Sequence, residues 1–158
     1  LAAGDAAKAA GWRRQAAALR QTTRQAFYHE DRWWDDTART TCSQLAAALA
    51  VLTAAATPAE APALLDAVVE RSLDLDDNPI PGTLVLASPF MHHYLFEALF
   101  LAGRTADVVE IVRRRWGRWA HAGYPTAWEN WNVDFPDGSQ CHAFSAHPYF
   151  HLVRIGKL

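Results

Sequence analysis

Residues 88–103 read SPFMHHYLFEALFLAG, and the fold prediction starts from this stretch. The Ser-Pro pair is a typical helix start and Gly103 a typical helix end, so the run predicts one helix. Apolar side chains cover nearly its whole circumference, and we therefore expect it to be buried on all sides. Residues 44–56, QLAAALAVLTAAA, form a second stretch of this kind, and YFHLVRI at residues 149–155 forms a third.

Helix-start signals place an amphipathic segment before each apolar one. Asp5 is the expected cap of the first amphipathic helix, Thr57 followed by proline that of the second, and Thr105 that of the third. Thr41 or Ser43 is the expected cap of the apolar helix that follows. The three amphipathic starts lie about fifty residues apart, which indicates a repeat of helical hairpins.

The alternation predicts an all-α fold in two layers, with outer amphipathic helices covering inner apolar ones. A bundle around a single core would make every helix amphipathic instead. We expect three helical hairpins, at roughly 5–56, 57–103 and 104–158, which together form an arc of one domain. Residues 27–40 lack a helical period and predict a loop or a short extended pair. The first residue is Leu1 rather than Met, so we expect a piece of a longer protein.

Composition and charge exclude several classes of function. The 158 residues carry a formal net charge of −2, which leaves no electrostatic footprint for nucleic acid. We expect no membrane segment, because no apolar run reaches membrane length, and the chain shows no signal-peptide pattern. Cys42 and Cys141 match no metal or redox spacing and are interpreted as two buried thiols. Four arginines are expected to form a solvated helix face: Arg113, Arg114, Arg115 and Arg118.

Four segments together resemble the six-hairpin (α/α)-barrel domain of bacterial α-L-rhamnosidases. They are FYHEDRWWDD (27–36), CSQLAAALAVL (42–52), the run from residue 88 to 131 that ends in TAWENW, and GSQCHAFSAHPYFHL (138–152). The third contains a Thr-x-Trp-Glu motif, and the fourth a Ser-x-x-His-Ala-aromatic-Ser-Ala-x-Pro motif. Each is weak alone, but their order and spacing are specific, and they span nearly the whole chain.

The resemblance has departures. Phe144 stands where the family commonly has Trp, and Leu45 where it often has His. The family's barrel has six hairpins, so the resemblance implies that these three are the C-terminal half of the (α/α)6 toroid. It also implies that the remaining half comes from the same chain or another, and that the general acid comes from an earlier hairpin.

Glu129 is the candidate catalytic residue. Inverting glycosidases use two carboxyl groups, of which one protonates the leaving oxygen and the other activates a water. The resemblance implies that Glu129, the Glu of the Thr-x-Trp-Glu motif, is this water-activating base, and we expect hydrogen-bond donors near it. The alternative interpretation is an exposed acidic residue that follows an aromatic one.

Several side chains are candidates for binding a carbohydrate substrate. The resemblance implies that His142 bonds a sugar hydroxyl, although a histidine bonded to backbone at a helix start fits equally. Trp34, Trp128 and Trp131 could stack on the apolar face of a deoxy sugar, while core packing is expected for at least one of them. Asp36 is a weaker candidate for accepting from a sugar hydroxyl, and a capping role fits it as well.

No metal or cofactor is expected. His93 and Glu97 lie four residues apart, as in half of a metal site, but no third ligand stands at a convincing spacing. They are interpreted as a hydrogen-bonded pair at or near the cavity. Nothing in the chain resembles a phosphate loop or a nucleophile elbow.

Two alternatives to a rhamnosidase remain open. One is another glycosidase on the same toroid, acting on glucosides or uronic sugars, because fold alone does not define a substrate. The other is a helical-repeat module without catalytic activity, whose concave face binds a partner. A sugar site predicts that Glu129, His142 and aromatic rings converge on one cavity, whereas a partner-binding module predicts a broad exposed apolar patch.

Overall fold

The computed structural model describes residues 5–132 and 138–157. Its elements, in chain order, are α1 (Ala6–Phe27), β1 (Tyr28–His29), β2 (Arg32–Trp33), α2 (Gln44–Leu52), α3 (Ala61–Leu73), α4 (His92–Leu101), α5 (Thr105–His121), the 3-10 helix η1 (Ala143–Ala146) and α6 (Pro148–Ile155). The all-α prediction is confirmed, with one two-residue β-hairpin where an extended pair was expected. The helices described are all too short or too polar to cross a lipid bilayer.

Capping explains where α1 and α2 begin and where α4 ends. Asp5 Oδ1 accepts the Lys8 N–H at 2.9 Å, and Ser43 Oγ accepts the Ala46 N–H at 3.0 Å, so Ser43 rather than Thr41 caps α2. Gly103, with φ of 72°, ends α4 as predicted.

Three predicted starts are corrected, the first being that of α4, which begins at His92, three residues after Pro89. Thr105 is the first helical residue of α5 rather than its cap, which is Arg104. The segment after Thr57 first forms a turn, and α3 begins three residues later than the proline suggested. The Glu60 carboxylate accepts the Thr57 N–H at 2.8 Å across this turn, which satisfies a donor that the late helix start would leave open.

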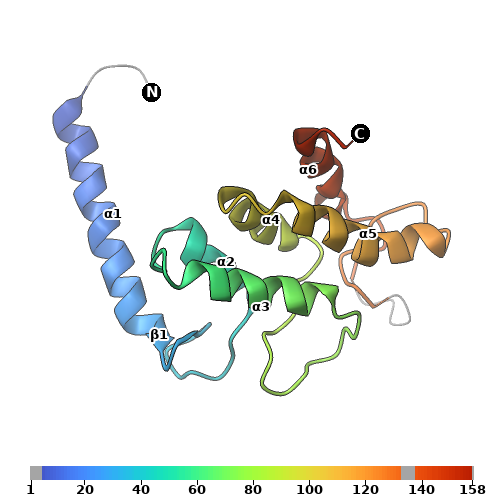
Figure 1. The fold of residues 1–158 in the computed structure, drawn as a ribbon, viewed down its shortest axis with the longest axis horizontal. Helices are drawn as coiled ribbons and strands as arrows, with labels where there is room; N and C mark the ends of the chain where they lie inside the picture. The colour runs from blue at the N-terminus through green and yellow to red at the C-terminus, as the bar shows by residue number, and fades with distance from the viewer. Residues whose placement is uncertain (1–4, 133–137, 158) are drawn as a thin grey trace.

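Four helices form the two layers that the alternation predicts. The apolar helices α2 and α4 pack against each other, and so do the amphipathic helices α3 and α5. The layers meet where α2 packs against α3 and α4 against α5 (Figure 1). The core between them contains fully buried Leu65, Val68, Leu95, Phe96 and Ile111.

An interhelical polar network, made of Gln44, Ser72, His92 and Arg115, ties the layers together. The Gln44 amide donates to Ser72 Oγ at 2.8 Å and accepts the Ala87 N–H at 2.8 Å. Ser72 Oγ donates to His92 Nε2 at 3.3 Å, and His92 Nδ1 donates to the Ser88 carbonyl at 3.0 Å. All four side chains are fully buried, so each depends on these partners for its hydrogen bonds.

Arg115 corrects the prediction of a solvated arginine face. It is fully buried, donates to the Ser72 and Asp74 carbonyls, and pairs with Asp77 at 2.9 Å. Its spacing from Val108, Ile111 and Trp119 places it on the buried face of α5, so the run of arginines misled the prediction and the helical period did not. Arg113 and Arg114 fit the prediction, because they are exposed and pair with Glu110.

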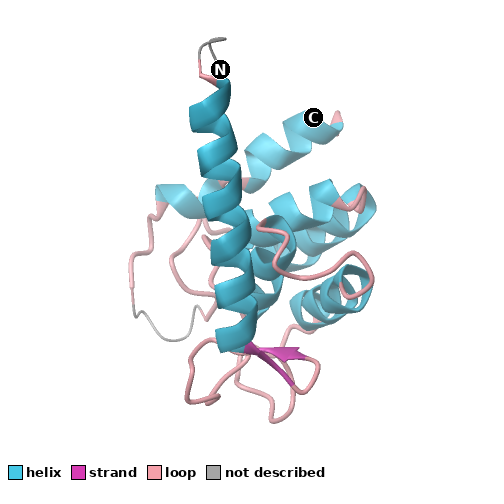
Figure 2. Cartoon of the chain, turned by 90° about the vertical axis from the view of Figure 1, so that its left-hand side faces the viewer, coloured by secondary structure: helices cyan, strands magenta, loops and turns pink. Residues whose placement is uncertain are grey.

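The helices at the two ends of the chain are packed more lightly. Helix α1 extends away from the other helices over most of its length (Figures 1 and 2). It has no buried residue, and its apolar Trp12 is 62% exposed. Leu49 on α2 is exposed, as are Tyr149, Phe150 and Val153 on α6. In this chain α2 and α6 are therefore not buried all round, because no described element covers these faces.

The connections between helices contain a β-hairpin, an isolated bridge and the two cysteines. The β1–β2 hairpin turns at Glu30 and Asp31, both with positive φ, as a two-residue turn between twisted strands requires. Val85 pairs with Ser43 in an isolated parallel bridge. Cys42 is buried but Cys141 is exposed, which corrects the expectation of two buried thiols.

Candidate active site

The segment after α5 folds back on itself and carries the predicted base. In this Thr126–His142 loop (residues 126–132 and 138–142), the Glu129 N–H donates to the Ser139 carbonyl at 2.8 Å, and the His142 N–H donates to the Ala127 carbonyl at 2.8 Å. The Thr126 hydroxyl donates to the Gln140 carbonyl at 2.5 Å. These bonds hold the Thr-x-Trp-Glu motif alongside the Ser-x-x-His motif, so the structure brings Glu129 and His142 into one loop.

The Glu129 side chain is exposed and held at one oxygen. Its Oε2 accepts the Ser139 N–H at 2.8 Å, which is the hydrogen-bond donor that the sequence analysis expected. Gly138, with φ of 83°, lies so close that a Cβ atom there would be 3.0 Å from Glu129 Oε2. The close contact explains why this turn has a glycine. The arrangement presents a carboxylate of fixed orientation at the surface.

His142 is half-buried beside aromatic rings. Its Nδ1 lies 2.8 Å from Ser145 Oγ, and its ring meets Phe90 and Phe144 edge-on, at centroid distances of 6.3 and 5.6 Å. Phe144 is 67% exposed and therefore offers an open aromatic face next to this histidine. Sequence reasoning noted Phe144 only as a departure from the family, although an aromatic residue two positions after His142 was a usable signal.

Trp128 and Trp131 lie in a small core of their own. Both are buried, together with Trp119, under the end of α5. Trp131 stacks on Trp119 at 5.3 Å and donates its Nε1–H to the Ala87 carbonyl at 2.7 Å. The structure thus places both rings in protein packing, and their stacking on a sugar stays a prediction.

Trp34 and Asp36 lie at the other end of the molecule. The segment after β2 that contains them lies beside the C-terminal end of α1, whereas the loop with Glu129 follows α5 (Figure 1). The Trp34 Nε1–H donates to the His29 carbonyl at 3.2 Å, and Trp34 lines a groove between α1 and α2. Asp36 accepts from the Thr40 hydroxyl and N–H, which lowers the pKa of its carboxyl group. The structure does not bring these two residues to Glu129, and it gives the cap of α2 to Ser43 rather than to Asp36, which bonds Thr40 in its own loop.

His93 meets histidines instead of the glutamate expected from sequence. Its Nδ1 lies 3.3 Å from Nε2 of His151, and its ring lies 5.5 Å from that of His147. Glu97 accepts hydrogen bonds from Arg154 at 2.8 and 3.0 Å. The predicted His93–Glu97 pair is therefore corrected, because partners from α6 come between the two.

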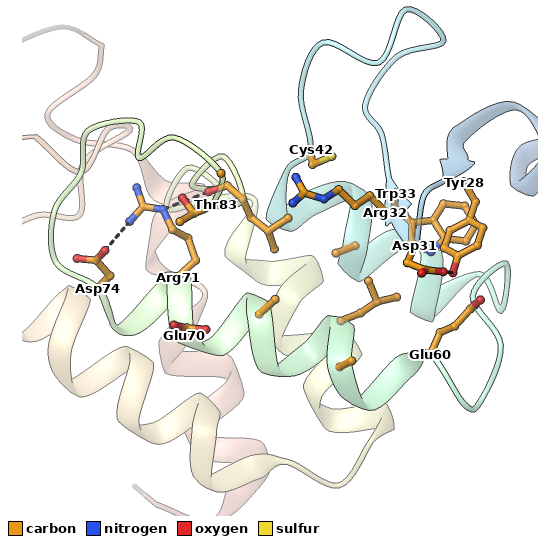
Figure 3. A pocket seen from close by; sticks show the side chains of 16 residues that line it. Tyr28, Asp31, Arg32, Trp33, Cys42, Glu60, Glu70, Arg71, Asp74 and Thr83 are labelled. Carbon is orange, nitrogen blue, oxygen red and sulfur yellow. Dashed lines mark hydrogen bonds and ion pairs between the residues drawn. The ribbon is translucent and has the colours of Figure 1, made fainter.

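A cavity of about 590 Å³ lies between the β-hairpin, α3 and residues 82–84 (Figure 3). Its charged lining includes Arg32, Glu60 and Arg71, but none of the predicted site residues. Glu60 is bound by Arg24, whose hydrogen bonds hold the pKa of Glu60 at about 2, and Arg71 donates to the Leu84 carbonyl at 3.2 Å. Glu60 and Arg71 are therefore already engaged by partners within the protein.

Comparisons with known proteins agree with the resemblance noted in the sequence. The family described as the bacterial alpha-L-rhamnosidase 6 hairpin glycosidase domain matches residues 1–155. A solved structure, the GH78 family rhamnosidase of Bacillus sp. GL1, matches with a TM-score of 0.64 and 26% identity.

That match covers 85% of this chain and 15% of the rhamnosidase, so the chain spans a small part of that protein's length. A search of curated proteins gives no match. The family match over nearly all of the sequence, together with the helical-hairpin architecture, leads to one conclusion: the chain belongs to the six-hairpin glycosidase domain family of the bacterial α-L-rhamnosidases.

Proposed function

We propose that this chain is part of the catalytic domain of an inverting α-L-rhamnosidase, in which Glu129 is the general base. The family and the GH78 relative support a glycoside hydrolase. The observation that carries the proposal is the position of Glu129, exposed and oriented by the Ser139 N–H in the same loop as His142.

The proposed reaction needs a water between Glu129 and the anomeric carbon. With Oε2 held by Ser139, Oε1 takes the proton from this water as its oxygen attacks the carbon. The bond to the leaving oxygen breaks on the opposite face, and a second carboxyl group protonates that oxygen. Such pairs stand roughly 6.5–9.5 Å apart in inverting enzymes. We propose that the second group comes from outside this chain, as the family resemblance implies.

The proposed sugar-facing wall consists of His142 and Phe144. The Ser145 hydroxyl fixes the orientation of the His142 ring, and His142 can bond a sugar hydroxyl as donor or acceptor. Phe144 supplies an exposed ring next to it, whereas the rings of Trp128 and Trp131 are buried. A deoxy sugar has an apolar face that suits such a ring.

The rest of the ring of hairpins would complete the site. The exposed apolar side chains of α1, α2 and α6 are the faces that adjacent hairpins would cover in a closed toroid. We therefore propose that the chain works with these further hairpins, and that its substrate is a carbohydrate with a terminal rhamnose.

The test is hydrolysis of a panel of nitrophenyl glycosides by the protein containing this chain and the remaining hairpins. We expect turnover of the α-L-rhamnoside, with NMR showing the β-anomer of rhamnose as the first product. Preferred turnover of a glucoside or uronide would favour the other glycosidase interpretation, and no turnover of any glycoside would favour a binding module. Release of the α-anomer first would exclude the inverting mechanism.

A further inference from the structure

Three histidines converge where α6 lies against α4. His93 is on α4, His147 is the cap of α6, and His151 lies one turn further along α6. One ring nitrogen from each lies within 4.8 Å of the other two. The residues of α6 follow an i, i+4 spacing, which places both imidazoles on one helix face.

The hydrogen bonds of the cluster show which nitrogens can accept. His147 Nε2 donates to the Pro89 carbonyl at 2.9 Å, so its Nδ1 carries a lone pair, and this buried atom has no hydrogen-bond partner among the described residues. His151 is fully buried, and its Nε2 faces His93 Nδ1 at 3.3 Å while its Nδ1 lies on the side of Glu97. An unpartnered buried lone pair is costly, and that of His147 therefore indicates a missing ligand.

The spacing of one pair of these nitrogens suits a tetrahedral transition metal, and the third nitrogen lies within 4.8 Å of both. Zinc binds imidazole nitrogens at 2.0–2.1 Å, so two ligands on a tetrahedral ion lie about 3.3 Å apart. The separation of 3.3 Å between His93 Nδ1 and His151 Nε2 equals this value.

We propose that His93, His147 and His151 bind one divalent transition-metal ion, of which Zn²⁺ is the best match to three imidazoles. His93 Nδ1, His147 Nδ1 and His151 Nε2 are the ligand atoms, and a water takes the fourth position. The proton that His93 and His151 share moves to the distal nitrogen of its own ring, so binding releases no net proton. This proposal replaces the expectation, based on sequence spacing, that the chain binds no metal.

Glu97 is the positioning residue of this site. Its Oε1 lies 3.7 Å from His151 Nδ1, close enough for a small movement to form a hydrogen bond. A carboxylate that accepts from the distal N–H of a ligand histidine fixes the tautomer and strengthens the metal bond. Arg154 holds Glu97 in place from the other side at 2.8 Å.

The metal would attach helix α6 to the packed helices of the core. Helix α6 exposes Tyr149, Phe150 and Val153, so apolar packing holds it on one side only. An ion bridging His93 to His147 and His151 would tie this helix to α4, in which Leu95 and Phe96 belong to the core. The proposed role is structural and does not depend on glycosidase activity.

The test uses the full chain freed of metal with EDTA and then titrated with Zn²⁺ or Co²⁺. We expect one Zn²⁺ per chain by calorimetry, a rise in melting temperature, and with Co²⁺ the intense visible absorption of a tetrahedral complex. The absence of saturable Zn²⁺ binding in the wild-type chain would overturn the proposal. An octahedral Co²⁺ spectrum would also overturn it.

Variants then locate the ion. His93→Ala and His151→Phe, the latter keeping an aromatic ring in the space beside Phe96, should abolish the Zn²⁺-dependent rise in melting temperature. Glu97→Gln should weaken binding by roughly tenfold or more. His121→Ala is the matched control, because His121 is exposed and its ring donates to the Gly117 carbonyl within α5, away from the three histidines. Unchanged Zn²⁺ affinity in folded His93→Ala, or equal loss in His121→Ala, would contradict the assignment.

Discussion

The interhelical polar network and the Thr126–His142 loop use similar side chains in opposite ways. In the network, Ser72, His92 and Arg115 are fully buried and bind partners from neighbouring segments. In the loop, Glu129 is exposed, and backbone bonds hold the loop itself together. Buried polar groups of the first kind fix the positions of helices, whereas groups of the second kind can meet a ligand. The residue types alone do not distinguish the two.

Glu129→Gln should give the largest effect, a loss of activity in the loop without the loss of stability expected in the network. If Glu129 is the base, the substitution should lower the kcat of rhamnoside hydrolysis by roughly 10²–10⁴-fold, since a general base contributes about that much. Stability should change little, because the side chain is exposed. The measurement is the steady-state rate in the protein with the complete ring, together with a urea unfolding curve.

Glu110→Gln is the control for this substitution, because Glu110 is a carboxylate on α5 that pairs with Arg113 and Arg114. Its rate should match that of the wild type. Azide added to Glu129→Gln should restore part of the rate and give a β-configured rhamnosyl azide, since azide needs no base. An unchanged kcat in Glu129→Gln would remove this residue from the mechanism.

Arg115→Met tests the network, where we expect the substitution to lower stability. The substitution keeps most of the packing volume but leaves the Ser72 and Asp74 carbonyls without their donor. We expect a loss of about 3 kcal/mol in the free energy of unfolding, as is typical when one member of a buried ionic network is removed. Urea denaturation measures this loss.

The matched variant is Arg113→Met on the same helix. Arg113 is exposed and pairs with Glu110, so the urea midpoint should stay at the wild-type value. A similar loss in both variants would mean that Arg115 is no more important to the fold than a surface arginine.

The pH dependence of stability provides a third test, through His92. Burial lowers its pKa to about 3, while an unfolded histidine has a pKa near 6.5. Below pH 6.5 the unfolded chain therefore binds a proton that the folded chain does not, and stability falls with the pH. The loss from His92 alone should be about 2 kcal/mol between pH 6.5 and 5.

The paired carboxylates add little to the change between pH 6.5 and 5. Glu60 and Glu110 have pKa values of about 2 in the folded chain, and their contribution to stability is lost mainly below pH 4.5, the pKa of an unpaired glutamate. Urea curves with EDTA at each pH give the slope, and His92→Asn should reduce it by about one proton. A slope that the substitution leaves unchanged would show that His92 takes up its proton in the folded state.

The sequence predicts the helices better than it predicts their partners. Periodicity locates α2, α3 and α4 because it is a local signal, although α3 and α4 begin three residues after the prolines that predicted their starts, and the family motifs locate Glu129 and His142 in one loop. The run of arginines assigned Arg115 to solvent, although its spacing from Ile111 and Trp119 places it on the buried face of α5.

Long-range contacts explain the other differences. The three-histidine cluster joins residues 58 positions apart, a contact that no local pattern encodes. Trp34 and Asp36 share residue chemistry with a sugar site, yet the chain places them beside α1, away from Glu129. An aromatic-acidic motif indicates the kind of contact a segment can make, and only the fold determines which segments meet.

Gly138→Ala has the smallest expected effect. It tests the orientation of Glu129 alone, because it disturbs the carboxylate without removing it. The new Cβ would lie 2.9 Å from Asn130 Nδ2 and 3.0 Å from Glu129 Oε2, and φ of 83° would cost alanine about 1 kcal/mol. We expect kcat to fall by roughly tenfold, since small misplacements of a catalytic group are costly. Gly123→Ala is the control, with a similar φ of 78° but open space around it, so it shares the strain without touching Glu129. If both variants lose equal activity, backbone strain and not the position of the carboxylate explains the loss, and the hydrogen bond from Ser139 has no special role in catalysis.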